Sequence, residues 1–146
     1  QLTRALYKAL QASGLHVQNY GTVFATIADA DKDEALSLIR RFYDLGFNIE
    51  ATSGTAAFLK KNGIRTHVCA KLSEGSGEIL DSIRGGHVTY VINTRDLDSP
   101  VGETDGMRIR RCATENNVAI FTSLDTVRVL LDVLEEMTIC VETIDS

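Results

Sequence analysis

The 146-residue chain has no tryptophan, a single proline (Pro100) and three cysteines, and each scarcity excludes a class of protein. Cys69, Cys112 and Cys140 are odd in number and form no Cys-x-x-Cys pair, so neither a disulfide framework nor a zinc site is predicted. No apolar run approaches the roughly 20 residues that a membrane helix needs. Basic residues are also fewer than acidic ones, with 15 Lys and Arg against 20 Asp and Glu, which gives a net charge of −5. We therefore expect neither nucleic acid nor a membrane as partner, and a reducing cytoplasm as the location.

What is present is typical of one globular domain. Hydrophobic residues make up 44% of the chain, which is too many for a disordered segment. The sequence begins with Gln1 and not with Met, and Gln1–Gly14 has the periodicity of an amphipathic helix. We expect the chain to be a piece of a longer protein, with that helix arriving from an upstream segment.

Strand patterns and helix patterns alternate along the sequence. Apolar runs rich in β-branched residues predict strands at Thr22–Ala28, Phe47–Ala51, Arg65–Ala70, Val88–Ile92 and Val118–Phe121. Helical spacing predicts helices at Lys32–Leu45, Gly54–Asn62, Glu78–Arg84, Arg108–Asn116 and Leu124–Glu136. Asp31 and Ser53 stand where the first two of these helices would be capped, and Ile139–Ile144 is either an edge strand or a trailing segment. The polar stretch Thr94–Met107 is predicted as a long loop.

This alternation predicts the fold class. Five strand–helix units indicate an α/β protein, a three-layer α/β/α sandwich with a five-stranded parallel sheet of the flavodoxin-like or Rossmann-like kind. Ligands of such sheets bind outside the carboxyl ends of the strands, so the turn after each strand is where a site is expected.

The Thr52-Ser53-Gly54-Thr55 turn is the sharpest of these features. Gly54 allows close approach of a ligand to the backbone, the following helix offers unpaired N–H groups, and the threonines add hydroxyls, which together suit a phosphate. Lys32 and Lys71 follow neighbouring strands and would neutralise the same anion. The plainer interpretation is that these residues only cap helices and face solvent. Neither G-x-G-x-x-G nor G-x-x-x-x-G-K-[ST] occurs, which argues against dinucleotide and P-loop sites.

Catalytic groups are sparse in the sequence. His16, His67 and His87 fall in a connector or at strand positions away from the expected ligand edge, so we interpret them as packed or surface residues. Cys69 stands near a strand end and is more simply a core residue. No spacing pairs two acidic residues for acid–base chemistry. We therefore predict no catalytic and no metal-ligating residues.

Four stretches resemble the methylglyoxal synthase-like superfamily, and most closely the C-terminal allosteric domain of the carbamoyl phosphate synthetase large subunit. They are GTVFATIADADKDEA, GFNIEATSGTAAFLKKNGI, VCAKLSEGSGEILDSIRGGHVTYVINT and RIRRCATENNVAIFTSLDT. The resemblance covers most of residues 1–135, and the segment ALYKALQASG resembles the connection of that domain to the synthetase body. It implies a linker helix at residues 1–20 and the allosteric domain at residues 21–146.

The resemblance also implies a site for a nucleotide monophosphate effector, UMP as inhibitor or IMP as activator. Its phosphate would be held by Lys32, Thr52, Ser53, Gly54, Thr55 and Lys71, and its ribose and base would lie near Thr26, Asn93, Thr94 and Arg95. Thr122 matches a position that contributes to ornithine sensing at the interface with the synthetase body. Arg95 stands where bacterial members have a second threonine, so the preferred base is left open.

The parent enzyme implied by this resemblance makes carbamoyl phosphate for pyrimidine and arginine biosynthesis, and pairs with a glutaminase small subunit. Its ATP, Mg and K would belong to the synthetase body, and this domain would hold no cofactor. Two alternatives remain. One is a stand-alone lyase of the methylglyoxal synthase type acting on dihydroxyacetone phosphate, with Asp29, Glu78 or Asp105 as base, although Ser76 stands where those enzymes carry their catalytic aspartate. The other is an interaction module with a vestigial pocket.

Overall fold

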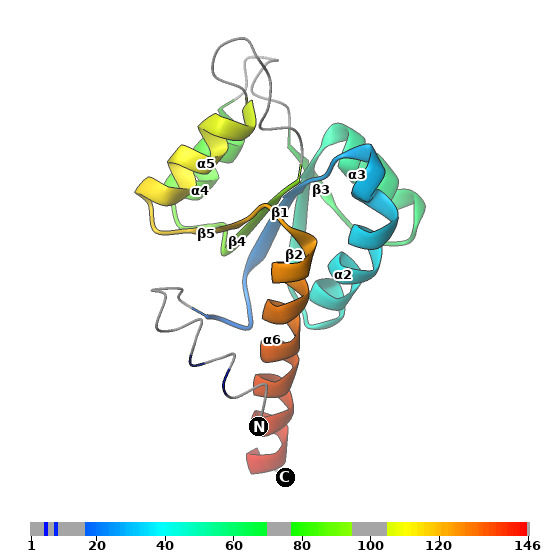
Figure 1. Cartoon of the computed structure of the whole chain (residues 1–146), viewed down its shortest axis with the longest axis vertical. Coiled ribbons are helices and arrows are strands. Elements are labelled where there is room, and N and C mark those ends of the chain that lie inside the picture. The colour runs from blue at the N-terminus through cyan, green and yellow to red at the C-terminus, as the bar shows by residue number, and fades with distance from the viewer. Residues whose placement is uncertain (1–4, 6–7, 9–16, 70–76, 95–104, 146) are drawn as a thin grey trace.

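Five parallel strands form one sheet in the order β3-β2-β1-β4-β5 (Figure 1). The computed structural model of the whole chain describes residues 5, 8, 17–69, 77–94 and 105–145. The strands are β1 (Thr22–Thr26), β2 (Asn48–Thr52), β3 (His67–Cys69), β4 (Tyr90–Asn93) and β5 (Ala119–Phe121). The sheet confirms the predicted parallel α/β architecture.

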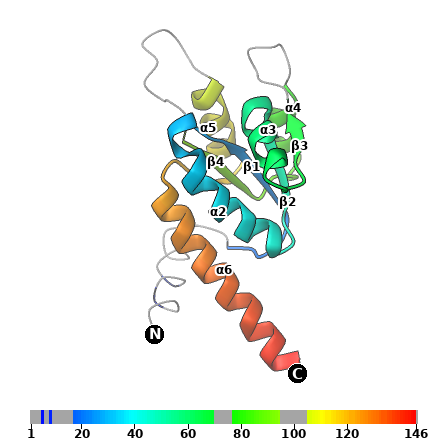
Figure 2. The ribbon, with the colours of Figure 1, turned by 90° about the vertical axis from the view of Figure 1, so that its right-hand side faces the viewer.

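Helices cover both faces of this sheet, which makes the molecule a three-layer α/β/α sandwich (Figures 1 and 2). One face packs against helices α2 (Lys32–Asp44), α3 (Ser53–Lys61) and α6 (Leu124–Asp145). The other packs against α4 (Glu78–Arg84) and α5 (Asp105–Glu115). A short 3-10 turn, η1 (Asp29–Asp31), joins β1 to α2. Within the described residues, no helix combines the length and apolarity that crossing a bilayer requires.

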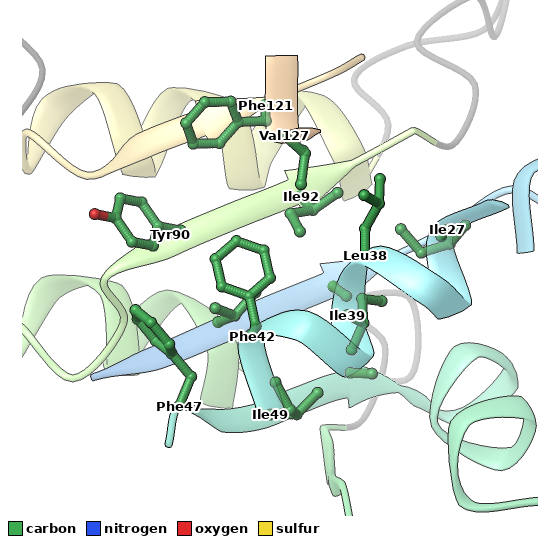
Figure 3. Packing of buried hydrophobic residues seen from close by; sticks show 14 of the residues in the cluster. Ile27, Leu38, Ile39, Phe42, Phe47, Ile49, Tyr90, Ile92, Phe121 and Val127 are labelled. Carbon is green, nitrogen blue, oxygen red and sulfur yellow. The ribbon is translucent and has the colours of Figure 1, made fainter. Parts of the chain in front are cut away.

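The larger core lies between the sheet and α2, α3 and α6, with Tyr90 at one side of it near Phe42 and Phe47 (Figure 3). The Tyr90 ring is fully buried and lies 6.0–6.2 Å from the rings of Phe42, Phe47 and Phe121. Its hydroxyl donates to the carbonyl of Gln18 at 2.7 Å and accepts from the Gln18 N–H at 2.8 Å. Burial raises the pKa of the Tyr90 phenol. A polar tip in an aromatic core thus fixes the chain just before β1.

An ion-pair cluster fastens α6 to α2. Arg41 of α2 makes two parallel hydrogen bonds to the Glu135 carboxylate, at 3.0 and 2.6 Å, and a third to Asp132 at 2.8 Å. The hydrogen bonds to these two carboxylates hold the pKa of Arg41 above its ordinary value. Both acids lie in the middle of α6, and beyond them the helix runs on past the sheet (Figure 2).

Several predicted boundaries need correction. Residues 139–144 belong to α6, so the expected edge strand there is wrong. Helix α5 begins at Asp105, which shortens the predicted loop. Asp31 occupies the N-cap position of α2 but is itself αR and makes no side-chain capping bond. The N-cap position of α3 is Thr52 and not Ser53, and Thr52 makes no side-chain capping bond either. The predicted helix at residues 1–14 falls almost entirely outside the described residues.

Candidate functional site

The carboxyl end of the sheet has a switch point between β1 and β4. The chain builds β1, β2 and β3 outward in one direction and then returns to place β4 on the other side of β1. At this point Thr26, the last residue of β1, pairs in register with Asn93, the last residue of β4. Open α/β sheets bind ligands in the crevice that such a reversal leaves.

The buried polar side chains gather at this edge. Among the described residues, the buried polar or charged side chains belong to four threonines and one asparagine. Thr26, Thr52, Thr55 and Asn93 are four of the five, all at the carboxyl edge and none more than 6% exposed. The Thr52 hydroxyl donates to the Thr26 hydroxyl at 3.3 Å. The edge is therefore lined by neutral hydroxyl and amide groups.

Two threonines hold the loop that follows β1 by its backbone. Thr55 Oγ1 accepts a hydrogen bond from the buried N–H of Ile27 at 3.1 Å. Thr94 Oγ1 accepts from the N–H of Ala28 at 3.0 Å. Each hydroxyl uses one acceptor position in this way and keeps its own hydrogen to donate. Both threonines thus shape the site and leave a donor for a ligand.

The start of α3 carries positive character from two sources. Thr52 is the N-cap residue, with extended backbone and no side-chain capping bond, so its own side chain leaves the first-turn N–H groups at Ser53 and Gly54 uncapped. Lys32 reaches over this turn from α2, and its Nζ lies 4.0 Å from where a Cβ on Gly54 would stand. The Lys32 side chain is 20% exposed and pairs with the 94% exposed carboxylate of Asp29. An anion at this turn would meet the ammonium and the helix N-terminus together.

The structure thus brings together most of the residues that the sequence nominated for ligand binding. Lys32, Ser53 and Gly54 lie at the first turn of α3, and Thr26, Thr52, Thr55, Asn93 and Thr94 line the adjoining edge. Thr122 is exposed and follows β5, which β4 and β1 separate from β2, so it stands apart from this group. Lys71 and Arg95 lie outside the described residues.

A second polar group escaped the sequence analysis. On the face of the sheet covered by α4, the Cys69 thiol donates to Glu50 Oε1 at 3.3 Å. His67 Nε2 lies 2.9 Å from Oε1 of Glu78, the first residue of α4. Burial, aided by the contact with Glu50, raises the pKa of the Cys69 thiol to about 12. The signal in the sequence was Glu50, which stands between two apolar residues, Ile49 and Ala51, that are both buried. A residue at that position lies on the second face of an inner strand, where a carboxylate is unusual.

The structure is that of a doubly wound α/β domain with buried threonine and asparagine side chains, and the start of α3, at the carboxyl edge of its sheet. A family model described as MGS-like domain matches residues 34–122, more than half of the chain. The chain belongs to the MGS-like domain family. Among solved structures, the chain is similar to methylglyoxal synthase from Elizabethkingia anophelis, with a TM-score of 0.64 and 17% identity over 79% of each chain. At that identity, the likeness concerns the fold.

Proposed function

We propose that this MGS-like domain binds a small phosphate ester at the carboxyl edge of its sheet, with the phosphate seated on the first turn of α3. The observation that carries this proposal is the position of the Lys32 ammonium above Gly54, at a helix start that its N-cap residue Thr52 does not cap with its side chain. A phosphate there would accept hydrogen bonds from backbone N–H groups and one charge-assisted hydrogen bond from the Lys32 ammonium. The hydroxyls of Thr52 and Thr55 stand behind the same turn.

The first candidate function is regulation. In this proposal the chain is the effector domain of a carbamoyl phosphate synthetase large chain, and a nucleotide monophosphate such as UMP or IMP is the ligand. Phosphate binding falls to Lys32 and the Thr52–Thr55 turn, with Lys71 assigned from sequence, and Thr26 and Asn93 lie at the switch point where ribose and base would extend. Effector binding would favour one packing of the domain against the synthetase body.

The character of the buried groups supports binding over proton abstraction. A general base needs a titratable group held within reach of the substrate. The buried polar residues that the structure describes at this edge are threonines and one asparagine, which orient a ligand by hydrogen bonds and do not titrate near neutral pH. The four sequence stretches named above favour the same candidate.

The second candidate is an enzyme, a lyase acting on dihydroxyacetone phosphate. The comparisons support this candidate at least as well, because a solved structure to which this chain is similar is a methylglyoxal synthase. Within the part of the chain that the structure describes, Asp29 is the carboxylate that lies beside the phosphate turn, since its Oδ1 contacts Lys32 Nζ. Glu78 instead contacts His67 at the start of α4.

Two assays on the same protein separate the candidates. Calorimetric titration with UMP, IMP and inorganic phosphate measures binding, and release of phosphate from dihydroxyacetone phosphate measures turnover. We expect saturable one-site nucleotide binding that Lys32→Ala weakens by roughly 10- to 100-fold, since a hydrogen bond to a charged group contributes about 1.5–3 kcal/mol. Lys60→Ala, at the exposed end of α3, is the matched control and should bind as the parent does.

Each outcome has a defined meaning. Nucleotide binding without turnover supports the regulatory proposal. Turnover that Asp29→Asn abolishes supports the enzyme in its place. If no phosphate compound binds, the proposal of a phosphate site is wrong. If Lys32→Ala and Lys60→Ala bind equally well, the phosphate site is assigned to the wrong turn.

A further inference from the structure

One row of side chains crosses the face of the sheet that α4 and α5 cover, and its character changes at β2. In register, Val91 of β4 pairs with Phe24 of β1, Phe24 pairs with Glu50 of β2, and Glu50 pairs with His67 of β3. Val91 and Phe24 are fully buried in the smaller core. A parallel sheet covered on both faces normally continues such a row with apolar residues. Here the row ends in a carboxylate and an imidazole.

A thiol completes this group. Cys69 is two residues beyond His67 and so lies on the same face of β3. One ligand atom from each of Glu50, His67 and Cys69 lies within 4.8 Å of the other two. A cavity of about 460 Å³ borders the group, and Glu50, His67, Glu78, Ser82 and His87 are among the residues that line it. The cavity provides a route from solvent to Glu50 and His67, and the Cys69 thiol is buried beside Glu50.

We propose that Glu50, His67 and Cys69 form a binding site for Zn²⁺. A sulfur, an imidazole nitrogen and a carboxylate oxygen are the three ligand types that zinc takes in proteins, whereas Mg²⁺ and Ca²⁺ prefer all-oxygen sites. The fourth position of a tetrahedral ion would face the cavity, where water can fill it. Glu78 contacts the His67 ring and is placed to orient it, as the outer carboxylate does in many zinc sites.

The geometry needs only a small adjustment. Ligand atoms about 2.0–2.3 Å from one zinc ion stand roughly 3.3–3.8 Å apart. The Cys69 sulfur already lies 3.3 Å from Glu50 Oε1, so the remaining adjustment is the approach of the His67 nitrogen from a separation of at most 4.8 Å. The His67 side chain is 61% exposed and Glu50 is half-buried, which leaves both free to rotate toward the buried sulfur. On binding, the Cys69 S–H bond is replaced by a sulfur–zinc bond and the proton passes to solvent, with no change of oxidation state. The ion would then link the edge strand β3 to β2.

The test uses Co²⁺ as a spectroscopic substitute for Zn²⁺ on the full chain, after treatment with a chelator. Tetrahedral Co²⁺ bound to a thiolate gives a sulfur-to-metal charge-transfer band and intense visible absorption. We expect both to saturate at one equivalent of Co²⁺ and to be displaced by Zn²⁺, and we expect Zn²⁺ to raise the Tm. Cys69→Ser should remove the charge-transfer band, and His67→Ala should weaken binding by at least about tenfold.

Cys112→Ser is the matched control, because that thiol is also buried but donates to the Leu80 carbonyl and is not one of the proposed ligands. It should retain the full spectrum. His67→Ala alters an exposed side chain, so it tests the site even if Cys69→Ser fails to fold. A parent protein without the charge-transfer band, or a band that survives in both Cys69→Ser and His67→Ala, would overturn the proposal. Nucleotide titration is a separate measurement, so neither result decides the other.

Discussion

Replacing Thr55 by valine tests whether the hydrogen bond from the Ile27 N–H to Thr55 holds the loop that follows β1. Valine has nearly the shape of threonine but accepts no hydrogen bond, so Thr55→Val leaves the buried Ile27 N–H without its acceptor. Leaving such a group unsatisfied costs about 1–3 kcal/mol. At roughly 3 °C per kcal/mol for a chain of this size, Tm should fall by about 3–9 °C.

Urea unfolding followed by circular dichroism gives the free energy, and a thermal scan gives Tm. Thr55→Ser keeps the acceptor and loses one methyl group, so it should lose no more than about 1 kcal/mol. Thr114→Val is the exposed control, since Thr114 donates only to the Arg110 carbonyl within α5, and its effect should stay within about 0.5 kcal/mol. If Thr55→Val is as stable as Thr114→Val, the hydrogen bond does not hold the loop.

Four further substitutions, one of them a control, test the core, the turn before β1 and the helix contacts. Tyr90→Phe should cost about 1–2 kcal/mol in urea unfolding. Burial raises the pKa of Tyr90, so the contribution of its neutral phenol to the free energy of unfolding is complete below the ordinary phenol pKa of about 10 and is lost as pH rises past it. Tyr90→Phe should therefore flatten the alkaline decline in the free energy of unfolding. An unchanged slope would contradict this. Gly21→Ala should cost at least about 2 kcal/mol, because φ is +122° and the new Cβ would overlap Thr89 Oγ1. Gly46→Ala is the control and should cost about 1 kcal/mol, because Gly46 also has a positive φ but a Cβ there would meet open space. Equal losses in the two variants would refute the overlap. Arg41→Gln should cost about 1 kcal/mol and reduce the salt sensitivity of Tm, and an unchanged Tm would mean that the ion pairs to α6 do not contribute.

The fold could be predicted from the sequence because its signals are local. Helix α4 has the predicted bounds, Glu78–Arg84, since a short apolar pattern there is followed at once by two glycines. The error at residues 139–144 has the same origin, because Ile139 and the apolar residues after it fit a strand pattern as well as a helix. Extending a helix that already begins at Leu124 costs little free energy, because only nucleation of a helix is costly. A local sequence pattern at residues 139–144 does not show that a helix precedes it.

The candidate site was predictable in part. The rule that ligands meet the carboxyl ends of strands nominated Lys32 and the Thr52–Thr55 turn, and the structure places them together. Sequence could not show that Thr55 also holds the Ile27 N–H, because that bond depends on the distance between β1 and α3. The approach of Glu50, His67 and Cys69 likewise depends on the β2–β3 register, which no local pattern specifies.

The strand order has a consequence for how the molecule folds. The bond from Thr55 to Ile27 spans 28 positions of the chain, whereas the bond from Thr94 to Ala28 spans 66, across the pairing of β1 with β4. Closing the longer loop costs more entropy, so we expect β1, α2 and β2 to associate early and β4 to join them late. The carboxyl edge is then one of the last parts of the molecule to be completed. A ligand that needs both halves of that edge would bind only the finished fold, and it would keep the two halves together by slowing the step that separates them.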